Sequence, residues 1–237
     1  MRTLSPLALV GFVLGLSGLG QVCGQDSGGG GVKENLDLPF DAIGDNDDED
    51  ELPEVVNFYG LNLEGDGFFY VVDRSGSMQD SGELNVAKRE VTKNIQEFSD
   101  RVQFGIVFFA KDVNQFPQGG QPAEANPGMK SSAISWVQAQ GGGSGSCCMA
   151  GFTAVLKLAS QSTAKRKVVV YLGDGGGTCS GEDESAYLAK TQSAINAQNF
   201  LRIQINTIGV LQIPEINEKF LKTVAASNGG TYSRVTR

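Results

Sequence analysis

The sequence contains no histidine in 237 residues. Without an imidazole, the chain cannot form the Ser–His or Cys–His pairs of hydrolases, nor a zinc site with histidine ligands. The Gly-x-x-x-x-Gly-Lys-Ser/Thr pattern of nucleotide-binding loops is missing from the sequence as well. We therefore expect a protein that is not an enzyme and that takes no small-molecule substrate.

The sequence also has no surplus of positive charge. Its 27 Asp and Glu residues outnumber its 19 Lys and Arg residues, which gives a formal net charge of −8. Eight of the acids lie between Asp41 and Glu54, and subtracting them leaves 19 acids, equal to the number of bases. Because nucleic-acid binding depends on clustered positive charge, we expect no nucleic acid among the partners.

Long hydrophobic runs are rare, and only residues 4–19 approach the length of a membrane span. Arg2 precedes this run, and small residues follow it, with Val22-Cys23-Gly24 as a candidate cleavage triplet. This order is typical of an export signal, so we predict that residues 1–24 direct the chain out of the cell or into the cell envelope or periplasm. An uncleaved membrane anchor and a lipid-modified Cys23 are the alternatives.

Residues 25–56 are predicted to form a linker. The segment 25–32 is rich in Gly and Ser, and the acid run follows it. Neither composition can bury a hydrophobic core. The acid run also lacks the glycine turn and the closing Glu of a calcium-binding loop, which favours a solvated spacer over a chelating site.

Continuous apolar runs predict the strands of the folded part, residues 57–237. The runs at 68–72 and 168–172 lead directly into acidic residues, Asp73 in the first case and Asp174, after Gly173, in the second. Runs of this kind are typical of strands buried on both faces, as in a parallel sheet covered by helices. Further strands are expected at 104–110, 203–210 and 231–235.

Helical patterns lie between the predicted strands. Apolar residues from Leu84 to Phe98 keep one helical face, and Ile216, Phe220 and Val224 repeat every four residues. Shorter helices are expected at 131–139, 149–160 and 184–198. The alternation predicts an α/β fold with a doubly wound, mostly parallel central sheet and helices on both of its faces.

A candidate metal site lies where the two acid-terminated strands end. Ligands of open α/β sheets bind beyond the carboxyl ends of the strands, so we expect Asp73 and Asp174 to come together there. Asp73 opens the turn Asp73-Arg74-Ser75-Gly76-Ser77, in which we expect Gly76 to permit an unusual backbone and alternate residues to face one point. Carboxylate and hydroxyl oxygens are hard ligands, which Mg²⁺ or Mn²⁺ prefers.

These residues carry a family resemblance. The stretch from Phe69 to Met78 resembles the first strand and metal-ion-dependent adhesion site of the von Willebrand factor type A family, and Leu172-Gly173-Asp174-Gly175 resembles its later Asp-Gly site. The resemblance covers about residues 57–237. It implies that Ser75 and Ser77 bind the metal directly and that Asp73 and Asp174 act directly or through water. It also implies an open coordination position that an acidic side chain of a protein ligand fills.

The sequence departs from the family at the remaining metal ligand, a threonine in a Gly-Gly-Thr segment of a middle loop. Ser146 takes this place if Gly151 and Phe152 stand for the small residue and leucine that follow the threonine at five and six residues. A serine keeps the hydroxyl and so keeps the ligand. Another alignment puts Ala150 there and removes the ligand, while Thr153 or Ser144 would also serve; we favour Ser146.

The opposing interpretation is a degenerate, metal-free site. Ser75 and Ser77 would then form a capped turn that Asp73 and Asp174 hydrogen-bond, and the chain would be a structural surface or envelope protein. Two converging carboxylates without a cation repel each other, however, and Arg74 should point away from them in an alternating turn. The sequence therefore favours an adhesion-type domain that binds a protein through Mg²⁺ or Mn²⁺.

Three cysteines follow the predicted signal: Cys147, Cys148 and Cys179. In an oxidising compartment this odd number predicts a pair and one remaining thiol. Adjacent cysteines rarely pair with each other because the ring is strained. Since both loops must approach the same metal, we hypothesise a disulfide from Cys179 to either Cys147 or Cys148. Three buried thiols are the alternative.

Overall fold

The computed structural model of the chain describes residues 52–175, 177–179 and 181–235. The predicted export signal, and the predicted linker as far as residue 51, lie outside these residues. Within the described ranges, none of the helices combines the length and the apolar character that a bilayer span requires.

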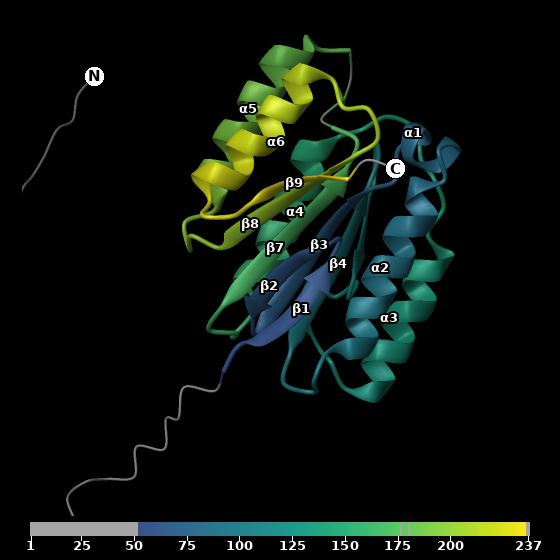
Figure 1. Cartoon of the computed structure of the whole chain (residues 1–237), viewed down its shortest axis with the longest axis vertical. Helices are drawn as coiled ribbons and strands as arrows, with labels where there is room; N and C mark the ends of the chain where they lie inside the picture. Colours follow the sequence, from purple (N-terminus) through teal and green to yellow (C-terminus); the bar gives the residue numbers. More distant parts are fainter. Residues whose placement is uncertain (1–51, 176, 180, 236–237) are drawn as a thin grey trace, which may run out of the picture. The chain divides into compact units, whose positions relative to one another are not determined.

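The sheet that carries the site has the strand order β5-β4-β3-β7-β8-β9 (Figure 1). Five of these strands run parallel. They are β4 (Gln103–Phe109), β3 (Gly67–Asp73), β7 (Lys167–Gly173), β8 (Gln204–Val210) and β9 (Tyr232–Val235). Two short strands, β5 (Val113–Phe116) and β6 (Ala123–Glu124), pair antiparallel with β4. The mostly parallel α/β sheet expected from the apolar runs is confirmed.

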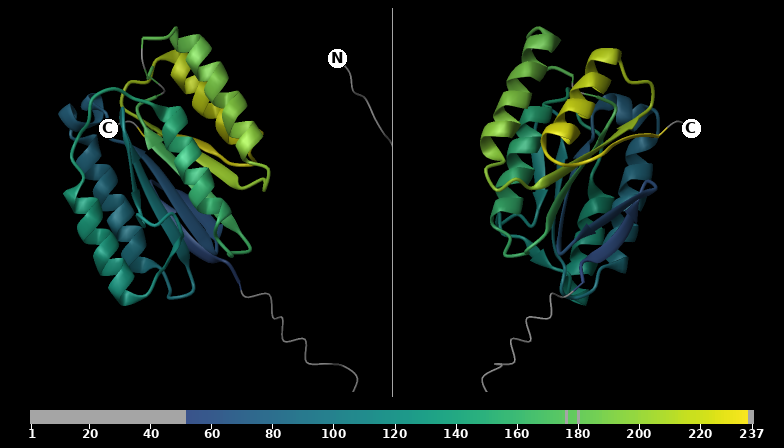
Figure 2. Two further views of the ribbon diagram at one scale, coloured as in Figure 1. Left: turned by 180° about the vertical axis from the view of Figure 1, so that it is seen from behind. Right: turned by 60° about the vertical axis from the view of Figure 1, so that its left-hand side comes forward.

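Helices cover both faces of this sheet (Figure 2). One face packs against α1 (Gly76–Asp80), α2 (Glu83–Glu97) and α3 (Pro127–Ala139), together with the antiparallel hairpin of β1 (Glu54–Phe58) and β2 (Leu61–Gly65). The other face packs against α4 (Cys148–Ser160), α5 (Glu184–Gln198) and α6 (Glu215–Ser227). The central strands β3, β4 and β7 are buried along almost their whole length because each of their faces meets one of these layers.

A glycine brings α4 close to the ends of β3 and β4. A Cβ on Gly151 would lie 2.7 Å from Phe109 Cδ1 and 3.1 Å from Val71 Cγ2. Only a residue without a side chain fits this contact, so the helix lies directly against the sheet. The loop that leads into α4 is thereby held beside the carboxyl ends of the strands, where the candidate site lies.

The folded part begins earlier than the sequence suggested. Strand β1 starts at Glu54, the last acid of the predicted spacer, whose carboxylate accepts hydrogen bonds from Ser99 N at 2.9 Å and Ser99 Oγ at 2.5 Å. The β1–β2 hairpin had no counterpart among the expected elements. In α6, Ile216 is 39% exposed, and its neighbour Asn217 is buried instead. A spacing of four advances about 40° beyond a full helical turn at each step, so Ile216 lies well off the face of Val224.

Candidate functional site

The adjacency of β3 and β7 brings the two predicted acids to one edge of the sheet. Their register pairs Val72 with Leu172, so the two parallel strands end side by side. Asp73 is the last residue of β3, and Asp174 directly follows β7. The arrangement is the one expected where loops converge beyond a parallel sheet.

Asp73 is a fully buried carboxylate. Its Oδ1 accepts a hydrogen bond from Ser75 N at 2.6 Å, and its Oδ2 accepts one from Ser146 Oγ at 3.0 Å. The pKa of Asp73 is raised to about 7, mainly by burial and also by the charge of Asp174, while hydrogen bonds from Ser75 and Ser146 limit the rise. Because burial disfavours its ionised form, a cation bound next to Asp73 would stabilise the charged carboxylate.

The raised pKa predicts how the chelator-treated chain responds to pH. Folded Asp73 holds its proton more tightly than the unfolded residue, so its contribution to stability is full below about pH 4 and is lost as the pH rises towards 7. The loss is on the order of 4 kcal/mol. We expect the free energy of unfolding of Asp73→Asn to show no such fall. Urea titrations of both proteins from pH 4 to 8 measure the difference; parallel curves would contradict the shift.

The turn after Asp73 brings two hydroxyls together. Ser75 Oγ and Ser77 Oγ lie 3.1 Å apart at the start of α1. The expected special role of Gly76 is wrong: its φ is not positive, and a Cβ there meets nothing within 4 Å. Ser75 is the N-cap residue of α1 and Ser77 lies in its first turn, so the start of this helix places the two hydroxyls side by side.

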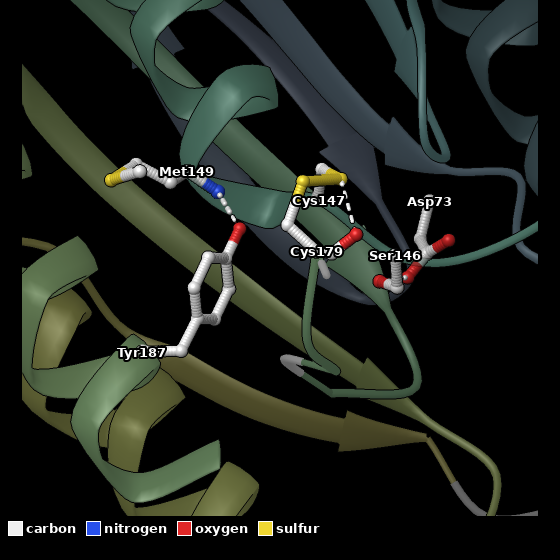
Figure 3. Close-up of a disulfide and its surroundings, with 6 residues drawn as sticks. All are labelled: Asp73, Ser146, Cys147, Met149, Cys179 and Tyr187. Atoms are coloured by element: carbon white, nitrogen blue, oxygen red, sulfur yellow. Dashed lines mark hydrogen bonds between the residues drawn. A yellow bond between two sulfur atoms is a disulfide. The ribbon is translucent and has the colours of Figure 1, made fainter. Parts of the chain in front are cut away.

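Ser146 is the middle-loop residue that reaches Asp73 (Figure 3). Of the other residues considered for this place, Ser144 and Thr153 are exposed, and Ala150 lies in the first turn of α4. Gly177 packs against Ser146, because a Cβ on Gly177 would lie 2.7 Å from Ser146 Cβ. The structure therefore brings Ser146 together with Asp73 and with the loop that follows Asp174.

Arg74 has a positioning role that no sequence pattern indicated. Its Nη2 lies 2.6 Å from Asp112 Oδ1, and its Nη1 donates to Gly141 O at 3.2 Å. Its backbone oxygen accepts a hydrogen bond from Gly143 N at 2.7 Å. The guanidinium thus faces Asp112, and it ties the glycine-rich loop to the turn that follows β3.

A disulfide joins the two loops of the site. Cys147, next to Ser146, is bonded to Cys179, in the loop after Asp174 (Figure 3). Of the two pairings that the sequence left open, the structure has the one from Cys147. Cys148 is a free and buried cysteine, and burial raises the pKa of its thiol to about 12. Its neighbour Met149 donates its backbone N–H to Tyr187 OH at 3.1 Å, which ties the start of α4 to α5.

The loops enclose a cleft of about 510 Å³. Among the residues that line it, Asp174 is the charged one, and the others are small or polar: Ser75, Gly76, Ser77, Gly145, Ser146, Gly175, Gly177, Thr178, Gln212, Pro214 and Asn217. In the described part of the chain, no cluster of three or more His, Cys, Asp or Glu residues forms a metal site. The lining instead offers three serine hydroxyls and the Asp174 carboxylate, and the buried Asp73 carboxylate is hydrogen-bonded to Ser146. This hard donor set fits Mg²⁺ or Mn²⁺.

Comparisons with known proteins agree with this architecture. The sequence profile of the von Willebrand factor type A domain matches residues 69–237. No curated protein sequence matches the chain at a significant level. The fold is similar to that of a solved structure described as von Willebrand factor type A from Catenulispora acidiphila, with a TM-score of 0.63 and 19% identity over 74% of this chain.

Two further solved structures come from pili. The pilus adhesin SpaC from Lactobacillus rhamnosus GG is similar with a TM-score of 0.57 and 12% identity over 75% of this chain. The PilB minor pilin from Streptococcus sanguinis is similar with the same TM-score, identity and coverage of this chain. The chain spans 40%, 28% and 59% of the lengths of the three structures, in the order given. At these identities the likeness establishes the fold.

Proposed function

The chain belongs to the von Willebrand factor type A domain family, and on that premise we propose that it is an exported, adhesion-type domain that binds a protein partner through a divalent cation. The cation is Mg²⁺ or Mn²⁺. The residues proposed to hold it, directly or through water, are Asp73, Ser75, Ser77, Ser146 and Asp174.

One observation carries this proposal: three serine hydroxyls line an open cleft, and a fully buried carboxylate, Asp73, is hydrogen-bonded to one of them. Asp73 contacts Ser146 directly, and the hydroxyls of Ser75 and Ser77 meet within 3.1 Å. A cation held mostly by neutral hydroxyls keeps a strong attraction for a further anionic ligand. A carboxylate from a partner protein would complete its coordination and would also be paired with the metal's charge.

The similar proteins support a role at the cell surface. SpaC is described as a pilus adhesin, PilB as a minor pilin, and Mfa5 from Porphyromonas gingivalis as a type V pili tip protein. We propose that the present chain is likewise exported and acts on a partner outside the cytoplasm. The predicted signal at residues 1–24 supplies the route.

A second candidate is a structural surface or envelope protein whose site works without metal. It is favoured by the hydrogen bonds that both Asp73 oxygens already accept, from Ser75 N and Ser146 Oγ. In that case Asp73 only accepts hydrogen bonds that stabilise the turn after β3 and the loop that carries Ser146.

The two candidates differ in their response to chelator. We expect the immobilised full chain to retain a surface protein in Mg²⁺ or Mn²⁺ and to release it in EDTA. Amidation of the carboxylates of the retained protein should abolish its binding, because the cation then lacks its anionic ligand. Retention that is unchanged by EDTA and by amidation would exclude recognition through a metal.

A further inference from the structure

The cleft extends beyond the proposed metal ligands to the start of α6. Four side chains of its wall are not proposed metal ligands and carry no charge: Thr178, Gln212, Pro214 and Asn217. The proposed metal chemistry uses none of these side chains. Three of them carry hydrogen-bonding groups, so this end of the cleft is suited to a neutral polar part of a ligand.

Asn217 is the buried member of this wall. It is 5% exposed, and within the described residues its Oδ1 is buried without a hydrogen-bond partner. Its backbone N donates to Pro214 O at 3.0 Å in the first turn of α6, so the main chain at this position is satisfied. A buried carbonyl oxygen without a donor destabilises the fold, and such a group in a native protein calls for a specific reason.

Space for the Asn217 side chain is provided by Gly175, the residue directly after Asp174. A Cβ on Gly175 would lie 2.7 Å from Asn217 Nδ2 and 2.9 Å from its Cβ. The same glycine has a φ of +140°, which side-chain-bearing residues rarely adopt, and its carbonyl accepts a hydrogen bond from the buried Tyr171 OH at 2.5 Å. The Asn217 carboxamide is therefore held against the backbone that carries a proposed metal ligand.

We propose that Asn217 is a specificity-determining residue of the cleft. Its carboxamide oxygen accepts a hydrogen bond from a backbone N–H of an acidic peptide segment whose side-chain carboxylate binds the metal. This inference rests on the proposed function, and it adds that the site recognises a carboxylate within a peptide over a carboxylate alone. A bare carboxylate offers no N–H donor and so leaves the Asn217 oxygen unpaired.

The test compares two small probes on the Mg²⁺-loaded full chain. N-acetyl-aspartic acid N-methylamide carries a carboxylate between two peptide groups, whereas acetate carries the carboxylate alone. We expect the wild-type chain to bind the peptide-like probe about 10-fold more tightly in NMR titrations, the effect of about one hydrogen bond. In Asn217→Leu the preference should fall to about 2-fold or less, while the affinity for Mg²⁺ alone stays within about 3-fold of wild type.

The same variant separates recognition from a structural role. Because leucine has a similar size and leaves no oxygen unpaired, we expect the melting temperature of the ligand-free Asn217→Leu chain to rise by a few degrees. Asn217→Ala only removes atoms and should show the same loss of preference, and Asn196→Ala, an exposed asparagine on α5, is the matched control.

The outcomes are distinct. A wild-type chain that binds no Mg²⁺ would overturn the proposed function and this inference with it. Normal Mg²⁺ binding with an unchanged probe preference in Asn217→Leu and Asn217→Ala would overturn this inference alone. A lower melting temperature in Asn217→Leu, with the preference retained in Asn217→Ala, would make Asn217 a structural residue.

Discussion

Replacing Ser77 by alanine is expected to lower the affinity of the full chain for Mg²⁺ by about 100-fold or more. Ser77 Oγ is one of the two hydroxyls that α1 turns towards each other, and alanine removes this oxygen without disturbing the helix. Substitution of groups that only orient metal ligands commonly costs 10–100-fold, so loss of a proposed direct ligand should reach at least the upper end of that range. Calorimetry on chelator-treated protein gives both affinities.

Ser132→Ala is the matched control for this experiment. Ser132 is an exposed serine on α3, outside the residues that line the cleft, and its loss should leave the Mg²⁺ titration unchanged. Equal heats from wild type and Ser77→Ala, or no heat from either, would mean that the serine turn does not hold the cation.

The second large effect concerns the disulfide between Cys147 and Cys179. We expect the double variant Cys147→Ser, Cys179→Ser to lose about 3–4 kcal/mol in free energy of unfolding on the chain-entropy model, since the bond spans 32 residues. We also expect weaker Mg²⁺ binding, because the bond joins the neighbour of Ser146 to the loop after Asp174. Urea unfolding of the oxidised protein, with and without Mg²⁺, measures both losses.

Cys148→Ala is the control here, since it removes a sulfur but no cross-link. It should cost about 1 kcal/mol, the scale of a small cavity. Cys148 itself should resist alkylation in the folded chain, because it is buried and its thiol has a pKa of about 12. A Cys179 that is alkylated in exported, non-reduced protein would show that the bond does not form.

The sequence predicted the sheet well because its central strands carry an unusually simple pattern. All seven residues of β3 are buried, and six of the seven in β7 are buried. Short apolar runs of this kind, rich in β-branched and aromatic residues, are typical of strands buried on both faces. The β1–β2 hairpin buries only alternate residues, and its strands are five residues long. Because β1 begins at the last acid of the acid run, the sequence there was assigned to the linker and the strand was not predicted. Strands β5 and β6, of four and two residues, are too short for any periodicity to emerge.

Some residues of the candidate site could be predicted from the sequence, and others could not. Asp73, Ser75 and Ser77 are close in sequence and follow a strand directly, so their proximity is a local property. The sequence favoured Ser146 as the middle-loop ligand but could not decide between it and its alternatives. The approach of Ser146 to Asp73 depends on a glycine-rich loop, which Arg74 holds through Gly141 while it is itself paired with Asp112. These are long-range contacts that single-sequence patterns do not encode.

Two further features depended on the three-dimensional arrangement. Cys147, and not Cys148, pairs with Cys179 because of where α4 begins. Cys147 precedes the helix, whereas Cys148 is its first residue and packs into the core. The sequence did not indicate that Asn217 is buried, because the four-residue apolar repeat predicted that its neighbour Ile216 faces inward. Only the packing of α6 against Gly175 shows that the asparagine belongs to the cleft.

The presence of a divalent cation among these side chains can be observed directly. Crystals of the full chain grown with Mn²⁺ should show one anomalous scattering peak in the cleft, within coordination distance of Ser75 Oγ and Ser77 Oγ and close to Asp73, Ser146 and Asp174. The peak should vanish in Ser77→Ala crystals. An empty cleft at saturating Mn²⁺, or a peak confined to the acid run at residues 41–54, would contradict metal-dependent recognition by this domain.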